Sequence, residues 1–301
     1  MHGTVALHNA TAVVPFFSWQ LFVALAINVL IQAIQIGAYA ARLAGVRTGR
    51  IATSIALFNL FVLASRLATL VYTLMLAPLS DRAGNAVKSL ILHHAPVASV
   101  TQVQQLFELQ LRLIVVAGTA GTVLGGLLLP MFTYLYVRGV RSFERTKSIP
   151  HSLWRLFDPR VIVQVFAHIR VPHYREIFAF SAHNIPMRLL ISNVVVTAVY
   201  AIGVVAAYYA SVIDINVART AVTTSGIING IGTVAFTFFV DPTSSMIVDE
   251  AAKGERPVKE VQSMVFYLAL TAIVGWLVSQ ALLWPAAWII AQVAHLVNLG
   301  R

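Results

Sequence analysis

The sequence contains no cysteine and few acidic residues. Of its 301 residues, 11 are aspartate or glutamate and 11% are charged, compared with about 25% in soluble domains. The missing cysteines exclude disulfides, thiolate metal sites and iron–sulfur clusters. A hydrophobic share of 58% and a mean hydropathy of +0.80 leave more apolar surface than one buried core can cover. The composition therefore argues against a soluble globule and predicts an integral membrane protein.

The sequence also lacks the short motifs of several enzyme classes. It has no GxxxxGK[ST] phosphate-binding loop, no HExxH zinc motif and no GxSxG nucleophile elbow. We therefore expect no catalytic residue of these kinds, no metal site and no cofactor. No lysine or arginine precedes Arg42, so the first apolar run lacks the basic region of a signal peptide and is counted as a membrane span.

Long apolar runs predict an all-α, polytopic membrane protein with a single membrane domain, residues 1–301. A helix of about 20 apolar residues crosses a bilayer. We identify six runs of sufficient length, at residues 16–41, 51–77, 110–137, 187–212, 220–247 and 264–297. These runs are continuous, which favours helices over the alternating strands of a membrane barrel.

Basic residues are distributed unequally between the expected loops. The net charge of +10 is concentrated in the first, third and fifth loops, and the positive-inside rule then places both termini outside the cytoplasm. This distribution accounts for the charge without a nucleic-acid partner. The third loop, residues 138–186, is long and basic, and we expect it to lie on the membrane interface and contact anionic lipids. An ordinary cytoplasmic loop would show the same composition.

Polar side chains recur at helical spacing inside the expected spans. The first span carries Asn28, Gln32, Gln35 and Tyr39 on one face, which Arg42 continues. The second carries Asn59, Arg66 and Thr73. The third carries Glu108 and Arg112, which are spaced to pair. The fifth carries Gly226, Gly230, Thr233, Thr237 and Asp241. Such residues also join helices to one another, so each stripe has a purely structural interpretation, and the GxxxG pattern of Gly121 and Gly125 indicates close helix packing.

Arg66 is the most informative of these residues. An arginine at the bilayer centre costs about 2.5–3.5 kcal/mol even on the insertion scale, so its charge must be compensated. Either Asp241 forms a structural ion pair with Arg66, or Arg66 faces a water-filled cavity and binds an anionic ligand. The sequence leaves both alternatives open. Asp241 precedes Pro242, so we expect a distorted helix there.

The arginines are spread along the expected transmembrane path. Arg47 and Arg50 lie at the inner mouth, Arg66 near the middle and Arg112 towards the outer end. A guanidinium group binds phosphate oxygens through two parallel hydrogen bonds and stays charged at any physiological pH. The pattern therefore favours transport of an anion such as a phosphate.

Two blocks of the sequence are unusual in composition. The first block is GVRTGRIA at residues 45–52, followed by LFN at 57–59 and Ser65-Arg66; the second is SGIINGIGT at 225–233, followed by VDPT at 240–243. Both blocks resemble the Amj family, the alternate lipid II flippases of bacteria. The resemblance implies a six-helix protein of the bacterial cytoplasmic membrane. Its implied partner is lipid II, the undecaprenyl-pyrophosphate-linked peptidoglycan precursor, which the protein would move to the outer leaflet. The chain departs from the family pattern at Gly232, where alanine is expected.

The residues that we expect to bind the substrate are Arg47, Arg50, Asn59, Arg66, Glu108, Arg112, Asn229 and Asp241. The inner and central arginines would contact the pyrophosphate, the asparagines would hydrogen-bond a sugar or phosphate, and Asp241 would position an arginine. One alternative is a membrane enzyme acting on a polyprenyl phosphate or pyrophosphate, with Asp241 and Glu108 as the acidic candidates. Another is a scaffold for cell-wall synthesis enzymes.

Overall fold

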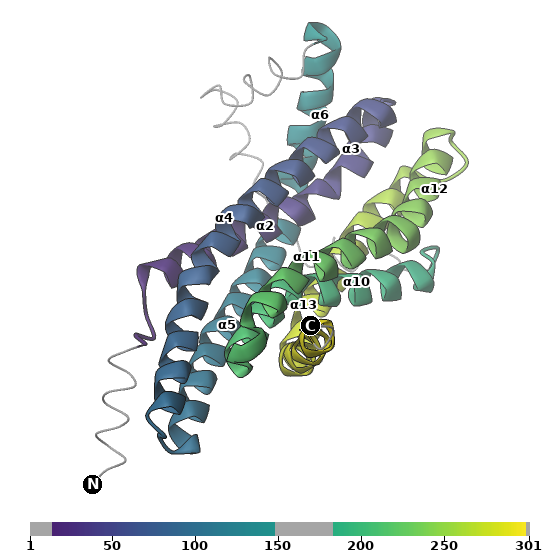
Figure 1. The fold of residues 1–301 in the computed structure, drawn as a ribbon. Coiled ribbons are helices and arrows are strands. Elements are labelled where there is room, and N and C mark those ends of the chain that lie inside the picture. Colours follow the sequence, from purple (N-terminus) through teal and green to yellow (C-terminus); the bar gives the residue numbers. More distant parts are fainter. Residues whose placement is uncertain (1–13, 148–182, 299–301) are drawn as a thin grey trace.

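The computed structural model describes residues 14–147 and 183–298, and these residues form helices joined by short connections, with no strand among them. The helices are α2 (Trp19–Ala38), α3 (Ala40–Thr48), α4 (Ile51–Leu92), α5 (Val97–Leu127), α6 (Leu129–Thr146), α10 (Met187–Ile213), α11 (Ala218–Ala235), α12 (Asp241–Ala252) and α13 (Val258–Asn298). A 3₁₀ turn, η1 (Ile215–Val217), precedes α11, and a π-helical turn, η2 (Phe236–Val240), separates α11 from α12. Figure 1 shows this arrangement and confirms the expected all-α class.

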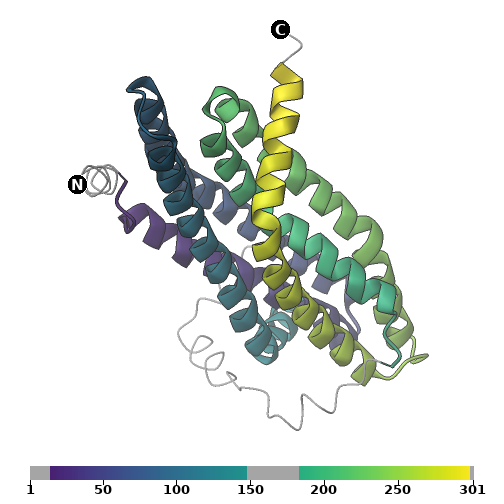
Figure 2. The same ribbon diagram turned by 90° about the horizontal axis from the view of Figure 1, so that it is seen from below.

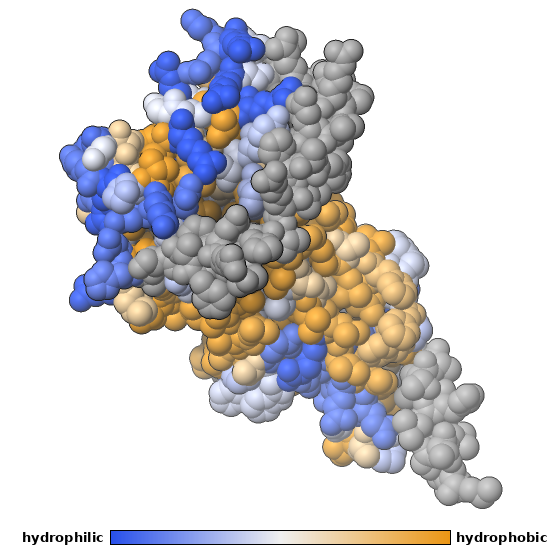
Figure 3. All heavy atoms as spheres, turned by 180° about the vertical axis from the view of Figure 1, so that it is seen from behind, coloured by the Kyte–Doolittle hydropathy of each residue, from blue (hydrophilic) through white to orange (hydrophobic). Residues whose placement is uncertain are grey.

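Six helical segments are long and apolar enough to cross a membrane, as the sequence predicted. They are Trp19–Thr48, Ile51–Leu92, Val97–Leu127, Met187–Ile213, Ile215–Ala252 and Val258–Asn298. In Figure 3 the visible face carries apolar side chains across its middle and hydrophilic side chains towards its ends. This distribution matches a bundle with its middle in lipid and its ends in water.

The third expected span differs from the structure. Residues 110–137 fall on two helices, because α5 ends at Leu127 and α6 begins at Leu129. Pro130 lies in the first turn of α6, where its missing N–H is no loss, and inside one continuous helix it would break a backbone hydrogen bond. The expected interfacial loop begins within α6, and its residues 148–182 lie outside the described residues.

Small residues and amides hold α2 against α5. A Cβ atom on Gly121 would lie 2.4 Å from the Val29 carbonyl oxygen, so glycine lets the two backbones approach and the packing interpretation of the GxxxG pattern is confirmed. Asn28 donates its side-chain N–H to the Ile114 carbonyl at 2.8 Å, and Gln32 donates to the Asn28 side chain at 3.1 Å. These amides of the first span therefore act at least partly as helix-joining groups.

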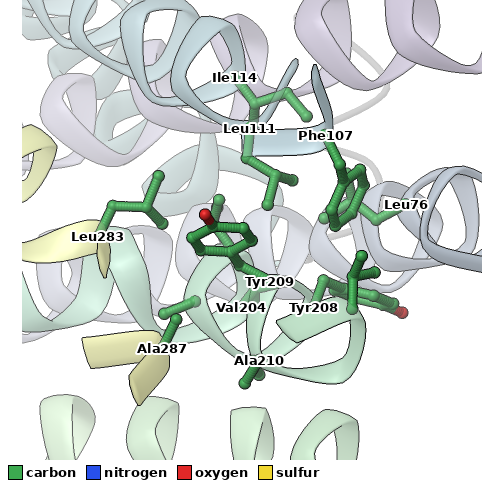
Figure 4. Close-up of a cluster of buried hydrophobic side chains, with 14 of the residues drawn as sticks. Leu76, Phe107, Leu111, Ile114, Val204, Tyr208, Tyr209, Ala210, Leu283 and Ala287 are labelled. Carbon is green, nitrogen blue, oxygen red and sulfur yellow. The ribbon is translucent and has the colours of Figure 1, made fainter. Parts of the chain in front are cut away.

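Two clusters of buried apolar side chains occupy the two halves of the bundle. One includes Leu76 from α4, Phe107 from α5 and Leu283 from α13, which surround Tyr208 and Tyr209 of α10 (Figure 4). The other is built from residues 36–44, 129–140 and 261–272 together with neighbouring segments. Figure 2 shows α13 running through the bundle, where it packs against both α5 and α10. The polar cavity described next is lined by side chains from both clusters.

Candidate functional site

A polar cavity of about 240 Å³ opens between α4 and α11, with α2, α10 and α13 also contributing to its walls. Tyr39 and Phe58 line the cavity from the apolar cluster that includes residues 36–44. Trp276 lines it from the cluster that includes Leu76 and Leu283. The polar side chains that line it are Gln32, Gln35, Asn59, Arg66, Thr197, Thr233, Thr237 and Asp241. The cavity therefore collects most of the polar stripes that the sequence placed on separate helices.

The structure brings three of the expected site residues to this one cavity: Asn59, Arg66 and Asp241. Asn229 lines a smaller adjoining cavity of about 30 Å³, which shares Gln32, Tyr200 and Trp276 with the first. The Asn229 Oδ1 atom is buried without a hydrogen-bond partner among the described residues. Whether these polar side chains converge was not predictable from the sequence, and the structure shows that they do.

Arg66 faces the cavity and forms no ion pair with any other described residue. It follows the start of α4 by about 22 Å at about 1.5 Å per residue. Arg66 thus lies within a helix that is long and apolar enough to cross a membrane, away from both ends of that helix. Of the two alternatives for Arg66, the structure supports the cavity, and the ion pair with Asp241 is wrong.

Asp241 pairs with Arg42 instead. The Asp241 Oδ1 atom lies 2.5 Å from the Arg42 Nη2 atom, and the Arg42 side chain is only 8% exposed. The Arg42 guanidinium carbon is 5.5 Å from the centre of the Tyr39 ring and 5.4 Å from that of Phe58, so both aromatic faces stabilise its charge. Asp241 thus contacts an arginine, but one that the sequence marks only as the end of a polar face.

The distortion expected at Asp241-Pro242 is present. Pro242 lies in the first turn of α12 and lacks the N–H that a continuous helix would use, and the turn before it, η2, is π-helical. Such turns are frequent at functional sites, because they change the direction of the following side chains. Here Phe236 and Thr237 of η2 and the adjacent Asp241 all line the cavity.

Arg47 and Arg50 lie outside the cavity, at the exposed connection between α3 and α4. Gly49 has a φ of +67°, which allows the tight turn between these helices. Arg50 forms an ion pair with Glu144 of α6, and the two side chains are 63% and 38% exposed. The structure therefore places both arginines at the end of the bundle where α3 connects to α4.

Glu108 and Arg112 form the expected pair, at 2.7 Å, but away from the cavity. Arg112 also donates to the Gln280 carbonyl at 3.0 Å, and the Tyr209 hydroxyl donates to Glu108 at 2.7 Å. This network joins α5, α10 and α13. Both charges are satisfied within the bundle, so their geometry supports helix packing rather than contact with a substrate.

The described parts of the chain, 14–147 and 183–298, contain no cluster of three His, Asp or Glu side chains that could hold a metal ion. Asp241 is paired with Arg42, and Glu108 belongs to a separate network. The cavity thus offers one cation, amides and hydroxyls, which together can bind an anionic group that carries hydroxyls.

The fold and the cavity define a polytopic α-helical membrane protein with an intramembrane polar site. The model of the Amj family, described as alternate to MurJ, matches residues 27–294, and the chain belongs to this family. One relative, named lipid II flippase Amj, from Bacillus subtilis (strain 168), is 31% identical over 263 residues, which are 87% of this chain and 92% of the relative. No solved structure matches the chain significantly. The family resemblance seen in the sequence is confirmed.

Gly232, where the family pattern suggests alanine, lies in the cavity wall. A Cβ atom there would lie 3.3 Å from the Tyr200 Cδ2 atom, which is a tight contact. Glycine therefore leaves this wall wider by about one methyl group without requiring Tyr200 to move.

Proposed function

We propose that this protein is a lipid II flippase of the bacterial cytoplasmic membrane. It moves the headgroup of undecaprenyl-pyrophosphate-linked peptidoglycan precursor from the inner to the outer leaflet. Membership of the Amj family and the relative named lipid II flippase support this function. The observation in the structure that carries it is Arg66, a cation with no ion-pair partner among the described residues, facing a polar cavity inside an apolar bundle.

Arg66 is the group that binds the pyrophosphate. Its planar guanidinium offers two parallel N–H donors to phosphate oxygens. Asn59 lies two turns away on the same face of α4 and can hydrogen-bond the attached sugar or phosphate. Thr233 and Thr237 donate to their own helix backbone, at 2.9 and 3.0 Å, so their hydroxyl oxygens remain available as acceptors for sugar hydroxyls.

The cavity size limits how much of the headgroup it encloses. A volume of about 240 Å³ equals about eight water molecules at about 30 Å³ each. This is enough for phosphate groups, whereas a disaccharide pentapeptide must extend beyond it. The polyprenyl tail stays in the lipid, because moving its hydrocarbon chain from lipid into a polar cavity would cost free energy.

The basic end of the bundle faces the cytoplasm, and both termini lie outside. The basic residues at this end in the described segments include Arg47, Arg50, Arg141, Lys147, Lys253, Arg256 and Lys259. The hydrogen bond from Arg256 to Glu250 raises the pKa of Arg256, so this guanidinium group stays charged. The positive-inside rule gives the orientation. The same basic end, including the last turns of α6, contacts anionic lipids of the inner leaflet.

The enzyme alternative has weaker support. A hydrolase acting on a polyprenyl pyrophosphate needs an acid or base next to the phosphate. Asp241 lines the cavity, but its carboxylate is paired with Arg42. Glu108 belongs to another hydrogen-bond network. Release of inorganic phosphate from a polyprenyl pyrophosphate by purified protein would favour the enzyme over the flippase.

Complementation tests the proposal directly. The chain is expressed in bacteria depleted of their own lipid II flippase, and the lipid II that becomes accessible at the outer face is measured. We expect the wild-type chain to restore accessibility and Arg66→Ala, at matched expression, to lose it. Well-inserted wild-type protein that restores no accessibility would show that the proposal is wrong.

A further inference from the structure

A second polar cavity lies towards the other end of α4, in the half of the bundle that does not carry Arg47. Its volume is about 430 Å³, and side chains from α4, α10, η1 and α11 line it. The polar and charged ones are Ser80, Asp81, Asn85, Lys88, Ser211 and Arg219. None of these residues belongs to the site expected from the sequence, and the cavity shares no residue with the one around Arg66.

The charged side chains of this second cavity are available to a ligand. Asp81, Lys88 and Arg219 are exposed, and no ion pair within the described ranges includes any of them. Ser80 and Ser211 hydrogen-bond each other at 2.8 Å, which joins α4 to α10 at the cavity wall. With two cations and one carboxylate, the cavity has a net positive charge together with amide and hydroxyl groups. This chemistry fits a phosphate that carries sugar groups.

Both cavities lie on the same face of α4 and on the same face of α11. On α4, Arg66 in the first cavity and Ser80 in the second are 14 residues apart, close to four full turns, or about 21 Å. On α11, Thr233 and Arg219 have the same separation. A group that moves between the cavities along these two helices would therefore follow one face of each.

Two glycines lie on that face of α11 between the cavities. They are Gly226 and Gly230, spaced in steps of three and four residues from Val222 of the second cavity and Thr233 of the first. A Cβ atom added to either would meet no atom within 4 Å, so open space lies beside them. Between the cavities this face of α11 thus presents two glycines and the polar side chain of Asn229, which lies four residues before Thr233.

We propose that the second cavity is a binding site for the pyrophosphate and sugar part of the transported lipid after it leaves Arg66, and that the headgroup passes along Gly226 and Gly230. This inference rests on the proposed flippase function. Lys88 and Arg219 bind the pyrophosphate at the outer side, while Asp81 accepts hydrogen bonds from sugar hydroxyls and Asn85 both accepts from and donates to them. Two polar sites on one face of α11, with the polar Asn229 and two glycines between them, let the headgroup exchange one set of hydrogen bonds for another, which lowers its desolvation cost.

The natural absence of cysteine makes the test direct, because one introduced thiol is the only one to react. Gly84 lines the second cavity, and a Cβ atom there meets open space, so Gly84→Cys places a thiol inside it. Ser89, which is exposed on another face of α4 and does not line the cavity, provides the matched control Ser89→Cys. Each purified variant in vesicles is modified with sulfonatoethyl methanethiosulfonate, which is anionic, or with the trimethylammonium analogue, which is cationic and of similar size.

We expect the anionic adduct at Gly84→Cys to reduce lipid II flipping about tenfold more than the cationic adduct, a difference of about 1.4 kcal/mol, because a nearby sulfonate repels the pyrophosphate. At Ser89→Cys the two adducts should act alike. Equal effects of both adducts at Gly84→Cys, or the same charge dependence at Ser89→Cys, would overturn the inference. Unmodified wild-type protein that does not flip lipid II in these vesicles would instead contradict the proposed function.

A second measurement identifies the source of the bound phosphate. The rate at which Gly84→Cys reacts is measured in phosphatidylcholine vesicles alone, with added lipid II, and with added phosphatidylglycerol. Slower reaction with lipid II only supports the inference. Equal slowing by phosphatidylglycerol without lipid II would assign the cavity to ordinary anionic phospholipids and overturn it.

Discussion

Asp241 of the fifth span holds Arg42 of the first, with 2.5 Å between its Oδ1 atom and the Arg42 Nη2 atom. Because this carboxylate is paired with Arg42, Arg66 in the same cavity has no ion-pair partner among the described residues and is available to a ligand. The two arginines, Arg42 and Arg66, therefore have different roles. Arg42 joins α3 to the start of α12, and Arg66 is free to bind an anion.

Removing the Asp241 charge should destabilise the protein. Asp241→Asn leaves the Arg42 guanidinium, which is 8% exposed, without its counter-charge. Breaking a fully buried pair costs about 3–5 kcal/mol, and because the Asp241 side chain is 42% exposed we expect about 2 kcal/mol. Thermal unfolding in detergent measures the effect. In a double-mutant cycle, Arg42→Met combined with Asp241→Asn should be more stable than Asp241→Asn alone, and a double variant as unstable as the sum of the single changes would argue against a direct interaction.

Arg66→Ala should abolish transport without lowering stability. Arg66 forms no ion pair in the described structure, so its loss removes no packing interaction of that kind. A charge-assisted hydrogen bond contributes about 1.5–3 kcal/mol, so flipping should fall at least about tenfold. Arg66→Lys retains the charge but not the planar fork, and should retain part of the activity. The initial rate of lipid II flipping in vesicles, measured beside the unfolding temperature, tests both variants; full activity in Arg66→Ala would remove this residue from the route.

Apolar length alone predicted most of the fold, because about 20 apolar residues in series have few stable structures other than a membrane helix. The prediction was wrong where one apolar run is divided between two helices. Residues 110–137 are predominantly apolar, yet α5 ends at Leu127 and Pro130 lies in the first turn of the next helix. Hydropathy does not register such a break, while the proline, read for its missing N–H, does indicate it.

Spacing along one helix was readable from the sequence, and partners on different helices were not. Glu108 and Arg112 pair as their i, i+4 spacing predicts. The partner of Asp241 depends on which arginine of another helix lies beside it in the bundle. The position of Arg42 depends on the break between α2 and α3 at Tyr39, which the sequence pattern did not predict. The polar face ending at Arg42 was the available signal. That polar face alone does not show whether Arg42 or Arg66 lies next to Asp241.

The Glu108 network should matter for stability and not for transport. Tyr209→Phe removes the hydroxyl that donates to Glu108 at 2.7 Å, and leaves the ion pair with Arg112 in place. We expect a loss of about 1–3 kcal/mol, because a buried acceptor loses one donor. Flipping per folded molecule should stay within about twofold of wild type, since the network does not line the cavity around Arg66. A severe transport defect in stable, well-inserted Tyr209→Phe protein would move this network into the transport machinery.

Filling the glycine face of α11 should block transport by occupying space. A leucine at Gly230 extends into the open region between the two cavities, where a Cβ atom alone meets nothing within 4 Å. Leucine also has a higher helix propensity than glycine, by about 1 kcal/mol, so Gly230→Leu should fold at least as well as wild type. We expect flipping to fall at least about tenfold with no loss of thermal stability. Ile231→Leu, at an exposed neighbouring position on another face of α11, is the matched control and should transport normally. A Gly230→Leu protein that flips lipid II at the wild-type rate would show that the headgroup takes a different path past α11.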